Sequence, residues 1–207
     1  MKGKFITFEG CEGVGKSRQI KLLEEYLIKN GVNYYLTREP GGTTVSEEIR
    51  KVILDGKNVS MTDECEALLY AAARVQLLKE NVKPRLDRGE LVFCDRYIDS
   101  SLAYQGYARG LGVEFVEKIN DYAIQNFMPD YTVFLKLPPE IAFKRKGGVD
   151  KNDRLELSGM EFHQKVYEGY LDLAEKYKDR FIVIDASGER DQTHAKIISA
   201  LKEKGVI

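Results

Sequence analysis

The chain has 207 residues, and its 32 Lys and Arg are balanced by 33 Asp and Glu. This balance argues against a nucleic-acid-binding surface, so any anion must be bound by a few locally placed cations. An apolar fraction of 43%, with no uninterrupted apolar run near 18 residues, favours a single globular domain over residues 1–207 without a membrane span.

The N-terminus passes from Met1 directly into a strand expected over residues 4–9, without a signal peptide. The three cysteines, Cys11, Cys65 and Cys94, show no metal-binding spacing and are typical of reduced thiols. We therefore expect a cytoplasmic location.

A glycine-rich loop, GCEGVGKS, follows this first strand and precedes a helix expected over residues 16–29. It fits the pattern G-x-x-x-x-G-K-[ST], in which backbone N–H groups surround phosphate oxygens; the alternative is a chance match. Lys16 would reach the outer phosphates, and the Ser17 hydroxyl would hold Mg²⁺. The predicted triphosphate-binding residues are Gly10, Cys11, Glu12, Gly13, Val14, Gly15, Lys16, Ser17 and Arg18.

The rest of the chain alternates between strand and helix patterns. Further strands are expected near residues 33–37, 91–95, 132–137 and 181–185, and helices near 45–54, 63–86, 114–125, 139–146, 160–177 and 193–204. Pro84 should kink or end the third helix. This order predicts a five-stranded parallel sheet covered on both faces, with ligands at the carboxyl ends of the strands.

Charged residues follow several of these strands. Asp95 ends an apolar strand and would hold the Mg²⁺ shell; the alternative is a helix-capping aspartate. Arg38 and Arg96 lie at the carboxyl ends of two neighbouring strands, where their two guanidinium groups could together bind a second phosphate. The alternative is two surface arginines paired with Glu39 and Asp95.

Two further patterns have weaker signals. The basic, glycine-containing run from Lys144 to Arg154 predicts a mobile lid over the phosphates, and the alternative is a solvated loop. Tyr70 and Arg74 share a helix face and could contact a base, although taken alone they favour Tyr70 in the core and Arg74 on the surface. His163 and His194 are expected on the surface.

These motifs together resemble the bacterial type of thymidylate kinase, in the family's order and over nearly the whole chain from residue 5 to about 185. The combination of Arg-Glu-Pro-Gly-Gly-Thr with Asp-Arg-Tyr is highly specific, whereas the phosphate loop alone is shared by many nucleotide-binding proteins. The matching segments are FEG at 8–10, REPGGT at 38–43, YAAAR at 70–74, DRY at 95–97, SSLAYQG at 100–106, DRLE at 153–156 and FH at 162–163.

The resemblance implies an α/β P-loop nucleoside monophosphate kinase fold with a short mobile lid near residues 144–156. It implies transfer of the ATP γ-phosphoryl group to dTMP with Mg²⁺, giving dTDP and ADP for dTTP synthesis, by a homodimer. The balanced charge and the lack of a long apolar run argue, apart from the resemblance, against nucleic-acid and membrane partners. The residues implied in dTMP binding are Arg38 and Arg96 at the acceptor phosphate, Tyr70 stacked on thymine, Arg74 at its edge, Tyr104 against the sugar where a 2′-OH would lie, and Ser101, Gln105 and Glu12 in the same pocket.

Family members with an acidic residue in the phosphate loop carry the catalytic arginine in the lid. Glu12 is acidic and no arginine lies between Cys11 and Val14, so the resemblance assigns this role to the lid, where Asp-Arg-Leu-Glu favours Arg154 over Arg145 and Lys146. Arg18 and Ala73 depart from the family pattern. The implied catalytic residues are Lys16, Arg96, Arg154, Glu12 and Arg145.

Other functions remain open at this point. The nearest alternative is a kinase for another nucleoside monophosphate, against which Tyr104 and the Tyr70–Arg74 pair argue. A non-catalytic nucleotide-binding switch is disfavoured because two acceptor-side arginines would have no role in it.

Overall fold

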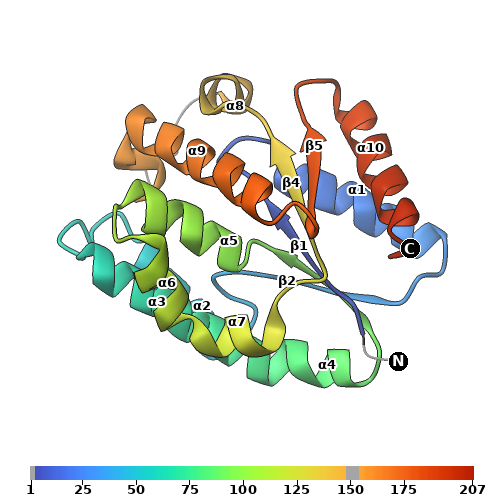
Figure 1. Cartoon of the computed structure of the whole chain (residues 1–207), viewed down its shortest axis with the longest axis horizontal. Helices are drawn as coiled ribbons and strands as arrows, with labels where there is room; N and C mark the ends of the chain where they lie inside the picture. The colour runs from blue at the N-terminus through green and yellow to red at the C-terminus, as the bar shows by residue number, and fades with distance from the viewer. Residues whose placement is uncertain (1–2, 148–153) are drawn as a thin grey trace.

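A five-stranded parallel sheet forms the centre of the computed structural model, which describes residues 3–147 and 154–207 (Figure 1). The strand order is β2-β3-β1-β4-β5, so β1 lies in the middle of the sheet. The strands are β1 (Phe5–Glu9), β2 (Tyr34–Arg38), β3 (Leu91–Asp95), β4 (Tyr131–Lys136) and β5 (Phe181–Asp185). All five predicted strands and the predicted α/β fold are confirmed.

Apolar side chains cover both faces of the sheet. Phe5 belongs to the core on one face and Ile6 to the core on the other, as the period-two alternation of a strand requires. Val92 and Phe93 in β3 repeat this arrangement. Removing each of these fully buried side chains from water contributes roughly 1.5–3 kcal/mol, so helices must pack on both sides.

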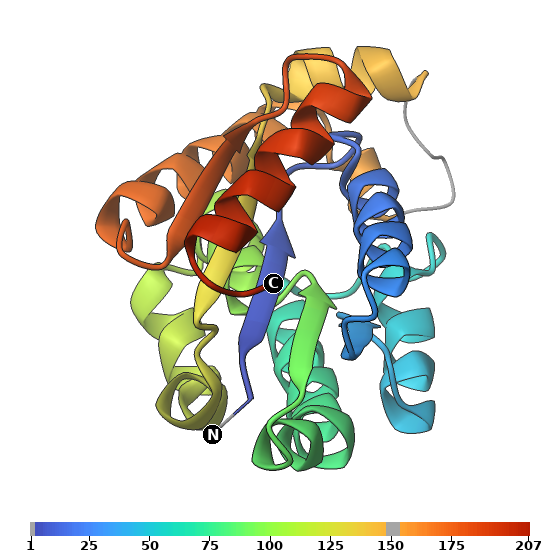
Figure 2. The same ribbon diagram turned by 90° about the vertical axis from the view of Figure 1, so that its right-hand side faces the viewer.

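Figure 2 shows α1 and α10, in blue and red, toward the viewer on one side of the sheet. This side has α1 (Lys16–Lys29), α8 (Pro139–Lys146) and α10 (Arg190–Glu203). The opposite side has α3 (Asp63–Leu77), η1 (Leu78–Val82), α4 (Lys83–Asp87), α5 (Ile98–Ser101), η2 (Leu102–Ala108), α6 (Val113–Ile119), α7 (Asp121–Phe127) and α9 (Met160–Lys176). Two further elements are α2 (Thr44–Leu54), which packs on α3, and the short η3 (Glu156–Ser158).

The long helix predicted around Pro84 is present with a local change in winding. Between α3 and α4, η1 is a π-helical turn, and Pro84 lies in the first turn of α4, where its missing N–H is tolerated. The helix predicted over 114–125 is divided into α6 and α7 at Asn120, whose side chain turns back to donate to the Val116 carbonyl at 2.9 Å.

Two expectations were incomplete or wrong. The segment of α5 and η2 was not predicted to be helical, because its Ser100-Ser101 and Gly106 have weak helix propensity and its π-type turns lack the usual apolar spacing. His163 was expected on the surface, but it is buried, with its ring 4.7 Å from that of Phe143. Of the helices in the described ranges, none has the length and apolar character that a bilayer crossing requires.

Candidate active site

The phosphate loop connects β1 to α1 at the carboxyl end of the sheet. Gly13 and Gly15 have positive φ angles of 76° and 93°, and Gly15 precedes the first turn of α1. A Cβ at Gly13 would come within 2.7 Å of the Ala142 carbonyl oxygen in α8, so only glycine fits there. The loop lines a cavity of about 650 Å³, to which Cys11, Glu12, Gly13, Val14, Gly15, Lys16, Ser17 and Arg18 all contribute.

Lys16, Ser17 and Asp95 converge where the phosphate loop meets β3. Lys16 Nζ donates a hydrogen bond to Asp95 Oδ1, and all three residues also line a second cavity of about 220 Å³. The Ser17 hydroxyl and the Asp95 carboxylate are oxygen donors of the type that Mg²⁺ prefers. Two such donors suit an ion that takes its other ligands from phosphates and water. In the described part of the chain, no group of three His, Cys, Asp or Glu side chains is placed to hold a metal ion.

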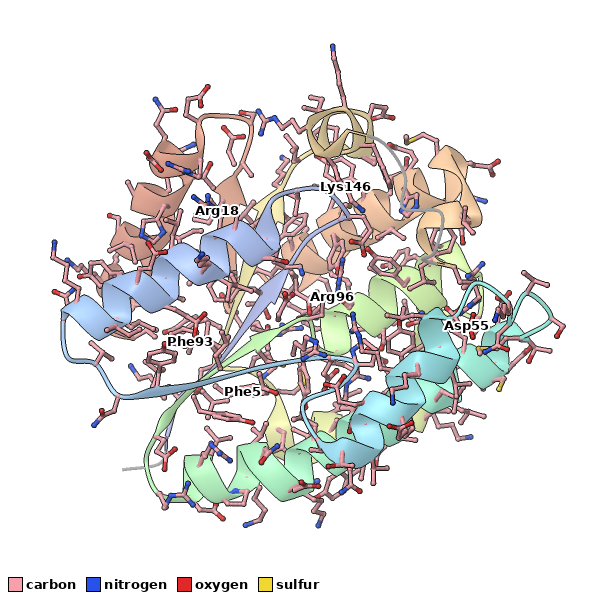
Figure 3. The ribbon with its side chains drawn as sticks, turned by 180° about the vertical axis from the view of Figure 1, so that it is seen from behind. Phe5, Arg18, Asp55, Phe93, Arg96 and Lys146 are labelled. Atoms are coloured by element: carbon pink, nitrogen blue, oxygen red, sulfur yellow. The ribbon has the colours of Figure 1, made fainter. Side chains whose placement is uncertain are left out.

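Arg96 lies between the phosphate loop and the helical segment that follows β3 (Figure 3). Its backbone adopts a positive φ of 68°, a costly conformation for a non-glycine residue. Its guanidinium donates to Glu12 Oε1 at 2.5 Å and to the Gly10 carbonyl at 3.0 Å. Burial acts to raise the pKa of Glu12, but Arg96 and Lys16 outweigh it, so this pKa lies below its usual value.

Arg38, at the end of β2, lines the second cavity together with Arg96. Its Nη2 donates to Glu47 at 2.8 Å, and its side chain is about half exposed. The alternative pairing of Arg38 with Glu39 and of Arg96 with Asp95 is wrong, because the partners are Glu47 and Glu12. Both arginines therefore present charge to one cavity, from two neighbouring strand ends.

Arg74 is the centre of a buried polar network in the floor of this cavity. Its side chain is 1% exposed and forms a two-pronged ion pair with Glu39 Oε2 at 2.8 and 2.7 Å. It also donates to Asn120, to Ser101 and to the Tyr97 carbonyl, at 2.6, 3.0 and 3.2 Å. The interpretation with Tyr70 in the core and Arg74 on the surface is wrong, since Arg74 is buried and Tyr70 is only partly buried.

The remaining predicted acceptor residues line the same cavity. Tyr104 places its ring 5.1 Å from the Arg96 guanidinium and donates its hydroxyl to Glu12 at 3.3 Å. Gln105 donates to Glu66, a fully buried carboxylate on α3, at 2.7 Å. The cavity is thus lined by Glu12, Arg38, Tyr70, Arg74, Arg96, Ser101, Tyr104 and Gln105, all eight predicted for the acceptor.

Comparison with known proteins agrees with this geometry. A family model described as thymidylate kinase matches residues 8–197. The chain belongs to the thymidylate kinase family. It is similar to the thymidylate kinases of Thermoanaerobacter sp. strain X514 (47% identity over 98% of this chain and 99% of the relative), Clostridium novyi (49%; 97% and 99%) and a Geobacillus species, strain WCH70 (46%; 99% and 98%).

The lid predicted for this thymidylate kinase family member falls partly outside the described residues, which exclude 148–153. At its start, Lys146 and Arg145 line the phosphate-loop cavity, and Arg145 Nη1 donates to the Ala186 carbonyl at 2.7 Å. Arg154 lies elsewhere: it binds Glu66 and donates to the Ile53 carbonyl at 3.0 Å. The structure therefore brings Arg145 to the phosphate loop and not Arg154, whose catalytic role stays a prediction.

Several lining residues were missed by sequence reasoning. Arg50 on α2 borders the acceptor cavity and donates to the Pro40 carbonyl at 2.9 Å. Arg190 and Thr193 on α10 border the phosphate-loop cavity. Each lies on a helix whose apolar residues have the usual helical spacing, so no nearby sequence motif distinguishes it from an ordinary surface residue. The fold alone brings these side chains to the two cavities.

Proposed function

We propose that the chain transfers the γ-phosphoryl group of ATP to dTMP, giving dTDP and ADP in the synthesis of dTTP. The observation that carries this proposal is the junction of two cavities. The phosphate-loop cavity and the cavity lined by Arg38 and Tyr70 share Glu12, Lys16, Ser17 and Arg96. A donor in one and an acceptor in the other would therefore bring their phosphates together at Lys16 and Arg96.

On the donor side, the loop amides and Lys16 would bind the ATP phosphates. Ser17 and Asp95 would hold Mg²⁺, directly or through water, and the ion would supply charge neutralisation between the phosphates. Lys16 and Asp95 are paired in this structure, so the ion and the phosphates would separate them.

On the acceptor side, Arg38 and Arg96 would bind the 5′-phosphate, and Tyr70 would stack on thymine. Arg74 and Ser101 offer hydrogen-bonding groups at the cavity floor, with Gln105 nearby, which suits the polar edge of thymine. Tyr104 would pack against the sugar and leave no room for a 2′-hydroxyl. Glu12, bound to Arg96 and Tyr104, would face the sugar or exchange its contact with Arg96 for one with substrate.

Phosphoryl transfer to dTMP would depend on positioning and charge neutralisation more than on a general base, because the acceptor phosphate is already anionic. Lys16 and Arg96 would stabilise the charge of the transferring group from the protein body. Arg145 and Arg154 remain candidates for the cation from the lid segment, and Arg154 would have to leave Glu66 to serve.

We also propose a homodimer in the cytoplasm. The support for association is apolar exposure on α2 and α3, where Val45, Val52 and Leu68 are 51%, 46% and 52% exposed. The support for a reducing compartment is that all three cysteines are free, including the exposed Cys65. Light scattering at working concentration should give twice the chain mass; a monomer there would overturn the dimer.

A coupled assay with ATP and a panel of dTMP, dUMP, dCMP, dGMP and AMP tests the activity. We expect the highest kcat/KM with dTMP, and loss of most of it in Arg96→Ala. A higher value with another monophosphate would identify a different kinase. ATP binding without turnover on any monophosphate would instead support a switch protein.

A further inference from the structure

Glu9, the last residue of β1, is a completely buried carboxylate that the proposed transfer does not use. We propose that Glu9 is a positioning residue, which holds Arg96 toward the acceptor phosphate through the hydroxyl groups of Ser100 and Tyr170. This inference rests on the proposed role of Arg96 and deepens it, since it states why that guanidinium points into the cavity.

Three donors from two parts of the chain converge on Glu9. Oε1 accepts the backbone N–H of Tyr97 at 2.8 Å. Oε2 accepts the hydroxyl of Ser100 at 2.6 Å and that of Tyr170 at 2.8 Å. Glu9 therefore ties β1 to the segment after β3 and to α9.

Because both hydroxyl groups donate to Glu9, their oxygen atoms are free to accept hydrogen bonds from Arg96. Each hydroxyl has one proton, and an ionised Glu9 draws both protons toward itself. The oxygens of Ser100 and Tyr170 then turn their lone pairs to Arg96 Nη1, which donates to them at 3.2 and 3.4 Å. Without the carboxylate, either hydroxyl could turn its proton toward a guanidinium that has only donors.

The backbone contact acts on the same residue. Arg96 has its positive φ of 68°, and the next N–H, that of Tyr97, is bound by Glu9. A fixed amide at that point helps the chain keep a conformation that a non-glycine residue rarely adopts. Glu9 thus constrains both the backbone and the side chain of Arg96.

Protonation of Glu9 would weaken this arrangement. Burial and the negative charge of Asp99 raise the pKa of Glu9 to about 7, although Ser100, Arg96 and Tyr170 act to lower it. Arg74 also faces this carboxylate as a positive charge. Below this pH the carboxyl group would have to donate one hydrogen bond itself. One of the two hydroxyls would then turn its proton to the other, 2.8 Å away, or toward Arg96, and the arrangement that presents both lone pairs to Arg96 would be lost.

The test compares Glu9→Gln and Tyr170→Phe with Tyr167→Phe, a control with the same chemical change on the same helix, outside this network. We expect Glu9→Gln and Tyr170→Phe to raise KM for dTMP roughly tenfold or more, with KM for ATP changed less than twofold. Tyr167→Phe should match the parent in both constants.

A pH profile separates positioning from a merely structural role. In the parent, kcat/KM for dTMP should fall below about pH 7, in addition to a fall near 6 from the substrate phosphate itself. Glu9→Gln should retain only the lower fall. The inference is overturned if the fall near 7 persists in Glu9→Gln, or if KM for ATP rises as much as KM for dTMP.

Two controls keep this outcome distinct from others. If Glu9→Gln does not fold, Ser100→Ala and Tyr170→Phe replace it in the test, because each removes one hydroxyl group and leaves Glu9 in place. An unchanged KM for dTMP in both variants would refute the inference. A parent protein that does not prefer dTMP would refute the proposed function instead, before any variant is compared.

Discussion

Replacing Arg74 with methionine should destabilise the protein and remove acceptor binding together. The change deletes a guanidinium that is 1% exposed and keeps most of its volume and chain length. It leaves Glu39, itself 5% exposed, without its cation, and it leaves the oxygens of Asn120 and Ser101 without their donor.

The expected loss in the free energy of unfolding follows from the groups that lose their hydrogen-bond or ion-pair partner. Breaking one side of a buried ion pair costs about 3–5 kcal/mol, because the remaining charge is buried and uncompensated. Burial already raises the pKa of Glu39 to about 7 against the opposing effect of Arg74, so Glu39 can take up a proton and limit the cost. We expect the free energy of unfolding to fall by about 4 kcal/mol, and Tm by roughly 10 °C for a chain of this size.

The pH dependence of this loss has a definite sign. A carboxyl group with a raised folded-state pKa stabilises the fold below its unfolded value of 4.5, and the stabilisation is lost as pH rises through the folded pKa. Without Arg74 that pKa rises beyond about 7, so the window of loss extends to higher pH. Arg74→Met should therefore be more destabilising at pH 8.5 than at pH 6.

Urea unfolding of the parent, Arg74→Met, Glu39→Gln and the double variant measures the effect. The double variant should recover about 1–3 kcal/mol relative to the sum of the single changes, because it no longer buries an unpaired carboxylate. Neither variant with methionine should bind dTMP, while both keep ATP binding. Strict additivity, or a loss under 1 kcal/mol in Arg74→Met at pH 8.5, would refute the reasoning.

Three further predictions concern neighbouring residues. Arg145→Met should lower kcat roughly 10²-fold, and Arg154→Met less than tenfold, if the lid arginine that lines the phosphate-loop cavity is the one that meets the transferring group; a reversed order in single-turnover assays would mean that Arg154 leaves Glu66. Tyr104→Ala should narrow the preference of kcat/KM for dTMP over its ribonucleotide analogue at least tenfold, and an unchanged ratio would remove Tyr104 from sugar selection. Glu66→Ala removes the buried carboxylate that Arg154 and Arg109 share, and Arg109 keeps its ion pair with Asp63 at 3.3 Å. It should lower the free energy of unfolding by about 3 kcal/mol, against about 0.5 kcal/mol or less for the exposed Glu64→Ala measured alongside it.

The strands and most helices could be predicted because their signals are local. The β-branched and aromatic run before Gly10 and the apolar run before Asp95 each specify a buried strand through their own composition. The helix of α5 and η2 has no such signal, since its stability comes from packing on α9, which is more than 50 residues away in sequence. His163 was misplaced for the same reason, as its cover comes from α8.

The residues of the site could be listed from motifs, but their partners could not. The resemblance named Arg96 and Arg38 as phosphate ligands, yet nothing in the sequence joins Arg96 to Glu12 or Arg38 to Glu47. Arg154 illustrates the same limit: its motif identifies it, whereas its contact with Glu66 depends on the packing of the chain against α3. Pairings between distant segments are decided by tertiary structure, which local patterns do not contain.

These pairings explain how so many cations are held in one small site. Three cations assigned to phosphates have a carboxylate partner in this structure: Lys16 with Asp95, Arg38 with Glu47 and Arg96 with Glu12. Arg74, assigned to the edge of thymine, is paired in the same way with Glu39. Without them, like charges around a cavity of about 220 Å³ would repel one another across a poorly screened interior. We therefore expect a bound phosphate to exchange with a carboxylate, which a neutral nucleoside cannot do. On this hypothesis the acidic Glu12 in the phosphate loop takes part in selection for a phosphorylated acceptor, because it would hold Arg96 until a more highly charged anion replaces it.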